Sequence, residues 1–377
     1  MRKVLLLGAS GSIGSQSIDI INDNANRFLL TAFSVGNRSE VIDELLSNHK
    51  EVRHVYLIDP KKAKEFSKKY PNVKFFSGKS GLRKLCNEAD YDMCVDALVG
   101  FSGLEPAVIA LKKNKILCLA NKEALVAGGT LINKLLVLGH GKLYPIDSEH
   151  VALAKCLAKS PEKPQKLIIT ASGGALRHVP LEDLDKMTKD DALKHPTWKM
   201  GNKITIDCAT MMNKGFEIIE AYYLYHYPLD RIDVLMHDES LVHSLIKLED
   251  GTMYLDYGKP DMHNPIRWAM FESDTPYEVM KIKSLDELSE CHFHEYDKRR
   301  YPCCELAKKC LVAGASKMIA LNAANEVAVN RFLKDEIKFT DIAKIVERVV
   351  NKTPIVYKPS LRKIKHIDKV SRKAAML

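Results

Sequence analysis

Short apolar runs alternate with amphipathic segments along the first third of the chain. Strands are predicted from these runs at residues 3–8, 28–35, 53–59, 93–100, 115–120 and 142–147. Residues 15–23 and 39–48, which lie between the first strands, carry apolar residues at helical spacing. Alternating strands and helices predict a parallel, doubly wound sheet, and such a sheet binds ligands beyond the carboxyl ends of its strands.

The pattern changes at about residue 148. A strand is predicted at 166–170, and antiparallel strands are predicted at 231–237, 241–248 and 251–258, with the hairpin turn "EDG" between the last two. Helical spacing predicts helices at 303–314, 315–335 and 339–352, with Gly314 as a C-cap. We therefore expect an α/β protein with a Rossmann-like N-terminal sheet, a central α+β domain and a C-terminal helical domain.

Composition and charge leave the class of ligand open. The 377 residues are 46% hydrophobic and 28% charged, which is typical of a globular protein. The net charge of +9 fits an anionic ligand such as a phosphate, or weak nucleic-acid binding, but a solvated lysine-rich surface is the simpler explanation. The apolar run at 4–7 is too short for a signal peptide, and the odd count of nine cysteines indicates reduced thiols. A cytoplasmic location is therefore expected.

Three glycines lie between the first predicted strand and helix, at Gly8, Gly11 and Gly14. Glycine permits a tight turn and lets backbone N–H groups approach a pyrophosphate at the helix N-terminus. The spacing is GxxGxxG rather than GxGxxG, and a tight turn without a ligand is the alternative. After the second strand, Arg38 stands where NAD-binding domains usually carry an acid, which favours NADPH unless Arg38 lies on an ordinary exposed loop.

Carboxylates in "PIDSEH" indicate a metal site. In extended chain, Asp147 and Glu149 point to the same side, and two adjacent carboxylates repel each other unless a cation lies between them. Oxygen ligands suit Mg²⁺ or Mn²⁺, and Glu217 is the candidate for a third ligand. A solvated acidic strand end is the alternative interpretation.

Other polar residues follow predicted strands or lie on a Pro- and Gly-bounded loop. Lys122 can reach a phosphate or polarise a carbonyl, and Ser172 with its two glycines can hydrogen-bond an anion. The segment "HPTWKMGNKIT" carries His195, Trp198 and Met200 and can close over a ligand. For Trp198, burial in the core is an equally simple interpretation.

Seven motifs together resemble one enzyme family. "GASGSIG", "LANKE", "PIDSEH", "TASGGALR", "HPTWKMGNKITIDCATMMNKGFEIIEA", "GKPDM" and "LNAANEVAV" occur in the order seen in 1-deoxy-D-xylulose 5-phosphate reductoisomerases, from about residue 4 to about residue 350. The resemblance implies a homodimer that uses NADPH and Mg²⁺ or Mn²⁺. It implies isomerisation and reduction of 1-deoxy-D-xylulose 5-phosphate to 2-C-methyl-D-erythritol 4-phosphate, in the non-mevalonate route to isoprenoids.

The same resemblance implies residue roles. The metal ligands are Asp147, Glu149 and Glu217, and the catalytic set adds Lys122. The substrate-binding residues are Lys122, Ser148, Glu149, Ser172, His195, Trp198, Met200, Cys208, Asn213, Lys214 and Glu217. The cofactor-binding residues are Ser10, Gly11, Ser12, Ile13, Gly36, Asn37, Arg38, Asn121, Glu123 and Gly201. For the rearrangement we favour carbon–carbon cleavage with rejoining, and a direct alkyl shift is the alternative.

Four segments are expected on this basis. Residues 1–147 form the NADPH-binding domain and residues 148–271 the catalytic domain, which holds the metal site and a mobile loop. Residues 272–297 form a linker, and residues 298–377 form the C-terminal helical domain.

Three positions depart from the family pattern. Ser10 replaces a frequent threonine, and "MHDES" at residues 236–240 replaces a segment closer to HPQS. Cys208 stands where the family usually has a phosphate-binding serine. Since the proposed chemistry needs a metal and a hydride donor, Cys208 is interpreted as a weak hydrogen-bond donor rather than a nucleophile.

Three other functions were weighed. An NADP-dependent dehydrogenase of another phosphorylated sugar or hydroxy acid explains the glycine loop but not the carboxylates together with the long middle motif. A nucleic-acid-binding protein lacks support, because no basic stripe with interleaved aromatic residues is present. The cysteines and histidines of "CHFH" and "CCELAKKC" do not have the spacing of common structural zinc sites.

Overall fold

The computed structural model describes residues 1–274 and 290–377, and these form two compact units. One unit comprises residues 1–124, 131–147 and 262–275, and the other comprises residues 125–130, 148–261 and 276–377, apart from the residues not described. Neither unit is one continuous stretch of chain, and each is described separately below.

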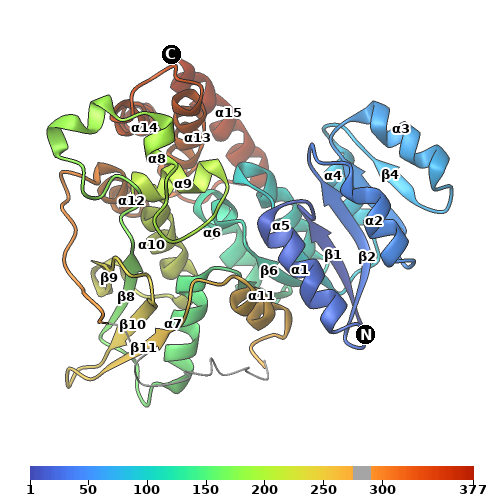
Figure 1. The fold of residues 1–377 in the computed structure, drawn as a ribbon, viewed down its shortest axis with the longest axis horizontal. Helices are drawn as coiled ribbons and strands as arrows, with labels where there is room; N and C mark the ends of the chain where they lie inside the picture. Colours follow the sequence, from blue (N-terminus) through green and yellow to red (C-terminus); the bar gives the residue numbers. More distant parts are fainter. Residues whose placement is uncertain (275–289) are drawn as a thin grey trace. The chain divides into compact units, whose positions relative to one another are not determined.

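The first unit is built on a seven-stranded parallel sheet of order β4-β3-β2-β1-β5-β6-β7 (Figure 1). The strands are β1 (Arg2–Leu7), β2 (Phe28–Val35), β3 (His54–Leu57), β4 (Lys74–Phe76), β5 (Met93–Asp96), β6 (Ile116–Leu119) and β7 (Lys142–Pro145). The six predicted strands and the doubly wound parallel sheet are confirmed. The three-residue strand β4 was not predicted, because so short a run carries no periodic signal.

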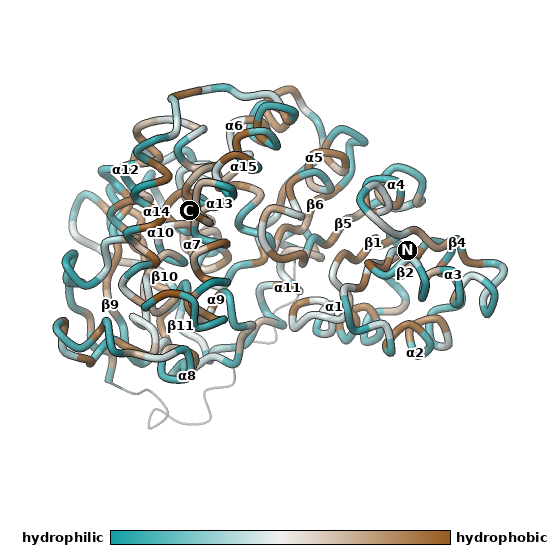
Figure 2. Tube along the Cα trace, turned by 90° about the horizontal axis from the view of Figure 1, so that it is seen from above, coloured by the Kyte–Doolittle hydropathy of each residue, from teal (hydrophilic) through white to brown (hydrophobic). Residues whose placement is uncertain are grey.

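Helices connect these strands. They are α1 (Ser12–Asp23), α2 (Val41–Asn48), α3 (Pro60–Lys69), α4 (Gly81–Glu88), α5 (Leu104–Lys112) and α6 (Lys122–Val137), with the 3₁₀ turn η1 (Gly100–Gly103) before α5. Residues 4–7 of β1 and 93–95 of β5 are apolar and buried, whereas α3 carries mostly charged side chains (Figure 2). The hydrophobic core of this unit is therefore centred on the sheet.

The turn from β1 into α1 requires glycine at two positions. Gly8 has φ +83°, a conformation that L side chains rarely adopt. A Cβ at Gly14 would lie 2.2 Å from the carbonyl oxygen of Gly8, so any side chain there would displace the loop. The glycines thus bring the loop backbone close to the N-terminus of α1.

The chain returns to this unit after residue 261, through α11 (His263–Met270). The ring of Trp268 packs edge-on against Tyr144 of β7 at 5.9 Å, and Phe271 packs against Phe28 of β2 at 5.1 Å. These apolar contacts explain why residues 262–271 cluster with the N-terminal sheet, although the expected catalytic domain included them. The division into four segments stays a prediction, and the linker at 272–297 lies largely outside the described residues.

The second unit contains a four-stranded sheet of order β11-β10-β8-β9. Its strands are β8 (Lys166–Ala171), β9 (Ile232–Met236), β10 (Val242–Lys247) and β11 (Met253–Tyr257). Strand β10 is antiparallel to β11, as predicted, and it is also antiparallel to β8. Strand β9 runs antiparallel to β10, as predicted, but it pairs with β8 instead, and that pairing is parallel. The reason is the helical connection from β8 to β9, because a long crossover returns the chain to the same end of a sheet.

Helices surround this sheet and form the C-terminal part. They are α7 (Ser148–Lys159), α8 (Lys189–Ala192), α9 (Asn202–Ala209), α10 (Met212–Tyr225), α12 (Pro302–Ala313), α13 (Ala315–Leu333), α14 (Asp341–Lys352) and α15 (Leu361–Met376), with the 3₁₀ turns η2 (Leu181–Lys186) and η3 (Leu229–Arg231). The predicted C-terminal helices and the Gly314 C-cap are confirmed, and α15 was not predicted. No helix in the described part of the chain is long and apolar enough to cross a lipid bilayer.

Stability of the first unit should depend on the protonation of Asp96, which is completely buried at the end of β5. Burial raises the pKa of Asp96 from its ordinary value of 3.8 to about 8. Because the protonated carboxyl favours the folded state, the free energy of unfolding falls as the pH rises from about 4 to about 8 and stays lower above that. Asp96→Asn should therefore stabilise the protein at pH ~9 and not at pH ~5, as measured by urea unfolding.

The control for this prediction is Asp92→Asn. Asp92 is exposed and lies next to β5 in sequence, so its replacement removes a carboxylate beside the same strand without relieving a buried charge. An equal gain from Asp96→Asn at both pH values would contradict the prediction.

Candidate active site

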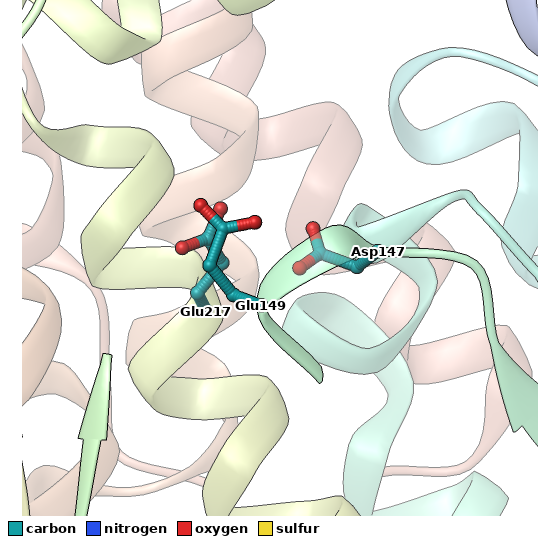
Figure 3. A group of neighbouring side chains, drawn as sticks. All are labelled: Asp147, Glu149 and Glu217. Atoms are coloured by element: carbon teal, nitrogen blue, oxygen red, sulfur yellow. The ribbon is translucent and has the colours of Figure 1, made fainter. Parts of the chain in front are cut away.

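Three carboxylates converge where β7 leads into α7. Asp147, Glu149 and Glu217 each offer an oxygen within 4.8 Å of the others, and Figure 3 shows their side chains gathered around a common space. Asp147 directly precedes α7, Glu149 lies in the first turn of α7, and Glu217 lies in α10. Glu149 is thus helical rather than extended, which corrects the predicted strand end, because an acidic residue is favoured in the first turn of a helix.

Two ammonium groups partly neutralise these carboxylates. The Nζ atom of Lys122 lies 2.8 Å from Oδ2 of Asp147, and the Nζ atom of Lys214 lies 2.9 Å from Oε1 of Glu149. Lys214 also contacts the carboxylate of Glu217, which is only 1% exposed. Although burial lowers the pKa of Lys214, Glu149 and Glu217 raise it above its ordinary value, so this ammonium stays charged.

The donor set fits a divalent metal ion. Three carboxylates held this closely repel one another, so a cation between them is favoured. All the ligand atoms on offer are carboxylate oxygens, which suit Mg²⁺ or Mn²⁺. Among the described residues, this is the one group of His, Cys, Asp and Glu side chains arranged to hold a metal, and a zinc site at "CHFH" or "CCELAKKC" gains no support there.

Ser172 and His195 form a small polar pair beyond the end of β8. The Oγ atom of Ser172 lies 3.1 Å from Nε2 of His195, while Nδ1 of His195 accepts a hydrogen bond of 3.0 Å from the backbone N–H of Trp198. Since Nδ1 accepts, the proton of the neutral ring lies on Nε2 and points to Ser172. Burial and the nearby Arg177 lower the pKa of His195 to about 4, so the ring is neutral at neutral pH.

Three of the predicted substrate residues flank the turn between α9 and α10. Cys208 is half-buried near the end of α9, and Asn213 and Lys214 lie in the first turn of α10. A Cβ at Gly174 would lie 2.6 Å from the backbone nitrogen of Ala209, so the loop that follows Ser172 packs directly against α9. Hydroxyl, thiol, amide and ammonium donors are therefore available within one unit near the N-terminus of α10, which favours anions.

The remaining predicted substrate residues are Ser148, Trp198 and Met200. The hydroxyl of Ser148 donates to the carboxylate of Glu149. Trp198 and Met200 are half-buried, and the ring of Trp198 packs against that of His243 at 6.2 Å. Trp198 is thus not a core residue, and sequence reasoning missed His243, whose position on β10 gave no signal.

The predicted cofactor residues group at the carboxyl ends of the strands of the first unit. Ser10 and Gly11 lie between β1 and α1, and Ser12 and Ile13 begin α1. Residues 36–38 follow β2, and Asn121 caps α6, where its side chain accepts from the N–H of Ala124 at 2.9 Å. Asn121 also donates to two carbonyl oxygens of the loop after β5. The side chain of Arg38 is 66% exposed. Glu123 lies in the first turn of α6, whereas Gly201 belongs to the other unit.

Comparisons with known proteins agree with this arrangement. Family models match residues 4–129 ("1-deoxy-D-xylulose 5-phosphate reductoisomerase"), residues 143–225 (the C-terminal domain of the same enzyme) and residues 257–374 ("DXP reductoisomerase C-terminal domain"). A 1-deoxy-D-xylulose 5-phosphate reductoisomerase of Geobacillus sp. is 39% identical over 376 residues, which is 99% of this chain and 98% of the relative. The Listeria welshimeri enzyme is 38% identical over the same shares.

Solved structures give the same result. A DOX-P reductoisomerase in complex with NADPH, fosmidomycin and magnesium superposes with a TM-score of 0.91 at 32% identity, covering 100% of this chain and 98% of that one. The Zymomonas mobilis 1-deoxy-D-xylulose 5-phosphate reductoisomerase in complex with NADPH has a TM-score of 0.87 at 33% identity, with 99% and 98% covered.

Binding of Mn²⁺ alone should depend on Glu217. Replacing Glu217 by Gln removes a carboxylate ligand, and the dissociation constant for Mn²⁺ should rise roughly tenfold or more. Isothermal titration calorimetry with Mn²⁺, without substrate or cofactor, measures this dissociation constant.

Glu220→Gln is the matched control, because Glu220 is about as buried as Glu217 on the same helix but lies outside the carboxylate group. Its Oε2 atom lies 3.3 Å from Nε2 of His150. An unchanged Mn²⁺ affinity in Glu217→Gln would show that Glu217 is not a metal ligand.

Proposed function

Because this chain belongs to the 1-deoxy-D-xylulose 5-phosphate reductoisomerase family, we infer that it converts 1-deoxy-D-xylulose 5-phosphate to 2-C-methyl-D-erythritol 4-phosphate with NADPH and a divalent metal ion. The reaction leads to isoprenoid precursors. The assignment to this site rests on the group of three carboxylates, two of which contact the ammonium of Lys214. A simple dehydrogenase of another phosphorylated sugar has no need of such a group.

We propose that Asp147, Glu149 and Glu217 hold the metal ion. When bound, a divalent ion supplies Lewis acidity toward a carbonyl and an adjacent hydroxyl. Lys122, which lies against Asp147, is placed to contact the same substrate oxygens, and Ser148 contributes a hydroxyl beside Glu149. These residues orient the carbon skeleton for its rearrangement.

The phosphate group is proposed to bind at Ser172, His195, Asn213 and Lys214, with Cys208 as a weaker donor. The neutral ring of His195 can donate through Nε2 without a charge of its own. Lys214 then links the phosphate to the metal carboxylates, because its ammonium already contacts Glu149 and Glu217. Binding energy from the phosphate, which does not react, can serve loop closure by Trp198 and Met200 and orientation of the reacting carbons.

NADPH is proposed to lie along the glycine loop. The backbone N–H groups at the start of α1 face the pyrophosphate, and the exposed Arg38 binds the 2′-phosphate. Asn121, Glu123 and Gly201 complete the cofactor site. The bound nicotinamide supplies a hydride.

A homodimer is also proposed, in line with the family resemblance. Strand β11 forms one edge of its sheet, and its side chains Met253 and Leu255 are 53% and 49% exposed. An exposed apolar edge strand is a site for pairing with another chain.

All nine cysteines are free thiols, which supports a reducing compartment such as the cytoplasm.

The proposed function is tested by following NADPH oxidation at the nicotinamide absorbance. Purified protein with Mg²⁺ and 1-deoxy-D-xylulose 5-phosphate should oxidise NADPH, and excess chelator should abolish the reaction because three carboxylates cannot replace the ion. Addition of Mg²⁺ after chelation is the control. Full activity in excess chelator would exclude the metal from the reaction.

Cys208 gives a separate prediction. Since a hydroxyl is a better hydrogen-bond donor than a thiol, Cys208→Ser should keep kcat and lower KM for the phosphorylated substrate by roughly twofold to tenfold. The control is Cys291→Ser, which changes a half-buried thiol outside the proposed site. Inactivation of Cys208→Ser alone would indicate that the thiol acts as a nucleophile.

A further inference from the structure

Asp207 is a buried carboxylate that none of the proposed ligand contacts uses. It lies on α9 directly before Cys208 and is 1% exposed. Its Oδ2 atom lies 2.6 Å from Nζ of Lys203, one helical turn earlier. Its Oδ1 atom accepts a hydrogen bond of 2.8 Å from Nδ2 of Asn325. A buried charge of this kind is stable only when such partners compensate it.

Asn325 brings a distant part of the chain to this carboxylate. It is fully buried on α13, within the motif "LNAANEVAV", and lies 118 residues after Asp207. Asn322, one turn earlier on the same helix, is also fully buried, but its amide donates to Glu326 of α13 at 2.9 Å. Of these two buried amides, Asn325 thus makes its hydrogen bond to α9, whereas Asn322 makes its bond within α13.

The carboxylate that Asn325 holds lies beside an unusual turn. Met211, between α9 and α10, has φ +53°, a left-handed conformation that is unfavourable for a residue other than glycine. The hydroxyl of Thr210 bridges this turn, since it donates to the carbonyl of Asp207 and accepts from the N–H of Met212, each at 3.3 Å. Such a conformation persists only where its surroundings hold it.

This turn leads into the first turn of α10, which carries Asn213 and Lys214. Helix α10 is also tightly packed there, because a Cβ at Gly215 would lie 2.6 Å from Cβ of Ala307 on α12. The ammonium of Lys203 on α9 lies 5.0 Å from the centre of the Phe216 ring on α10, so the two helices are in direct contact. The segment is therefore packed against the C-terminal helices α12 and α13, and it carries the proposed phosphate donors.

We propose that Asp207 and Asn325 are positioning residues for the phosphate anchor, through which helix α13 determines the affinity for the phosphoryl group of the substrate. The inference rests on the proposed function of Cys208, Asn213 and Lys214. Neither Asp207 nor Asn325 touches the substrate. Their hydrogen bond holds the α9–α10 turn in the left-handed geometry that aligns those donors.

The test compares Asn325→Leu with Asn322→Leu in the full-length enzyme. Removing the amide from Asp207 should raise KM for 1-deoxy-D-xylulose 5-phosphate roughly tenfold, the loss expected for a hydrogen bond to a charged group. The inhibition constant of inorganic phosphate should rise by a similar factor. KM for NADPH should not change, and kcat should change less than the substrate KM.

Asn322→Leu removes an equally buried amide from the same helix, so a purely structural effect would appear in both variants. Its substrate KM and phosphate inhibition should match the wild type. The exchange variant Asp207→Asn/Asn325→Asp keeps one carboxylate and one amide across the contact and should recover part of the loss. If Asn325→Leu does not fold, Asn325→Ser and Asn322→Ser are compared in the same way.

The outcomes separate the two proposals. A wild-type protein that does not turn over the deoxyxylulose phosphate overturns the proposed function. Binding of inorganic phosphate, followed by calorimetry, then still tests the positioning role. An active wild type with equal KM values in the two leucine variants, or an Asn325→Leu variant that binds inorganic phosphate normally, overturns the positioning role alone.

Discussion

The mutual repulsion of three closely spaced carboxylates is the constraint on which the site depends. Asp147, Glu149 and Glu217 are buried or half-buried within 4.8 Å of one another, where water screens their charges poorly. Lys122 and Lys214 compensate part of that charge, and Lys214 does so from the helix that also carries Glu217. In the proposed metal site a divalent ion completes the balance, and this proposal links metal binding to the local fold.

Sequence patterns predicted most of the fold, because long apolar runs and helical spacing are local signals. The six main strands of the parallel sheet and three C-terminal helices follow directly from them. The parallel pairing of β9 with β8 was not predictable, since it depends on the crossover helices rather than on the strand itself. The return of α11 to the first unit was also missed, because its contacts with Tyr144 and Phe28 join residues far apart in sequence.

Candidate residues of the site were predicted from motif resemblance and from charge. Spacing alone identified Asp147 and Glu149, although it placed Glu149 on an extended strand rather than in α7. Glu217 was only a candidate third ligand. Its side chain lies beside Glu149 because of the way helix α10 packs, which the sequence pattern does not give. The contacts of Asp207 with Asn325 were beyond local reasoning, because a buried aspartate and a buried asparagine carry no sequence signal that pairs them.

The discontinuous first unit has a consequence for how the protein folds during synthesis. Its sheet is complete in the chain by residue 145, but α11 and Phe271, which cover part of it, are made more than a hundred residues later. Until then, apolar surface around Phe28 and Tyr144 stays uncovered on the nascent chain. Partly made chains of this protein should therefore expose an aggregation-prone face that chaperones recognise, until the ribosome has released α11.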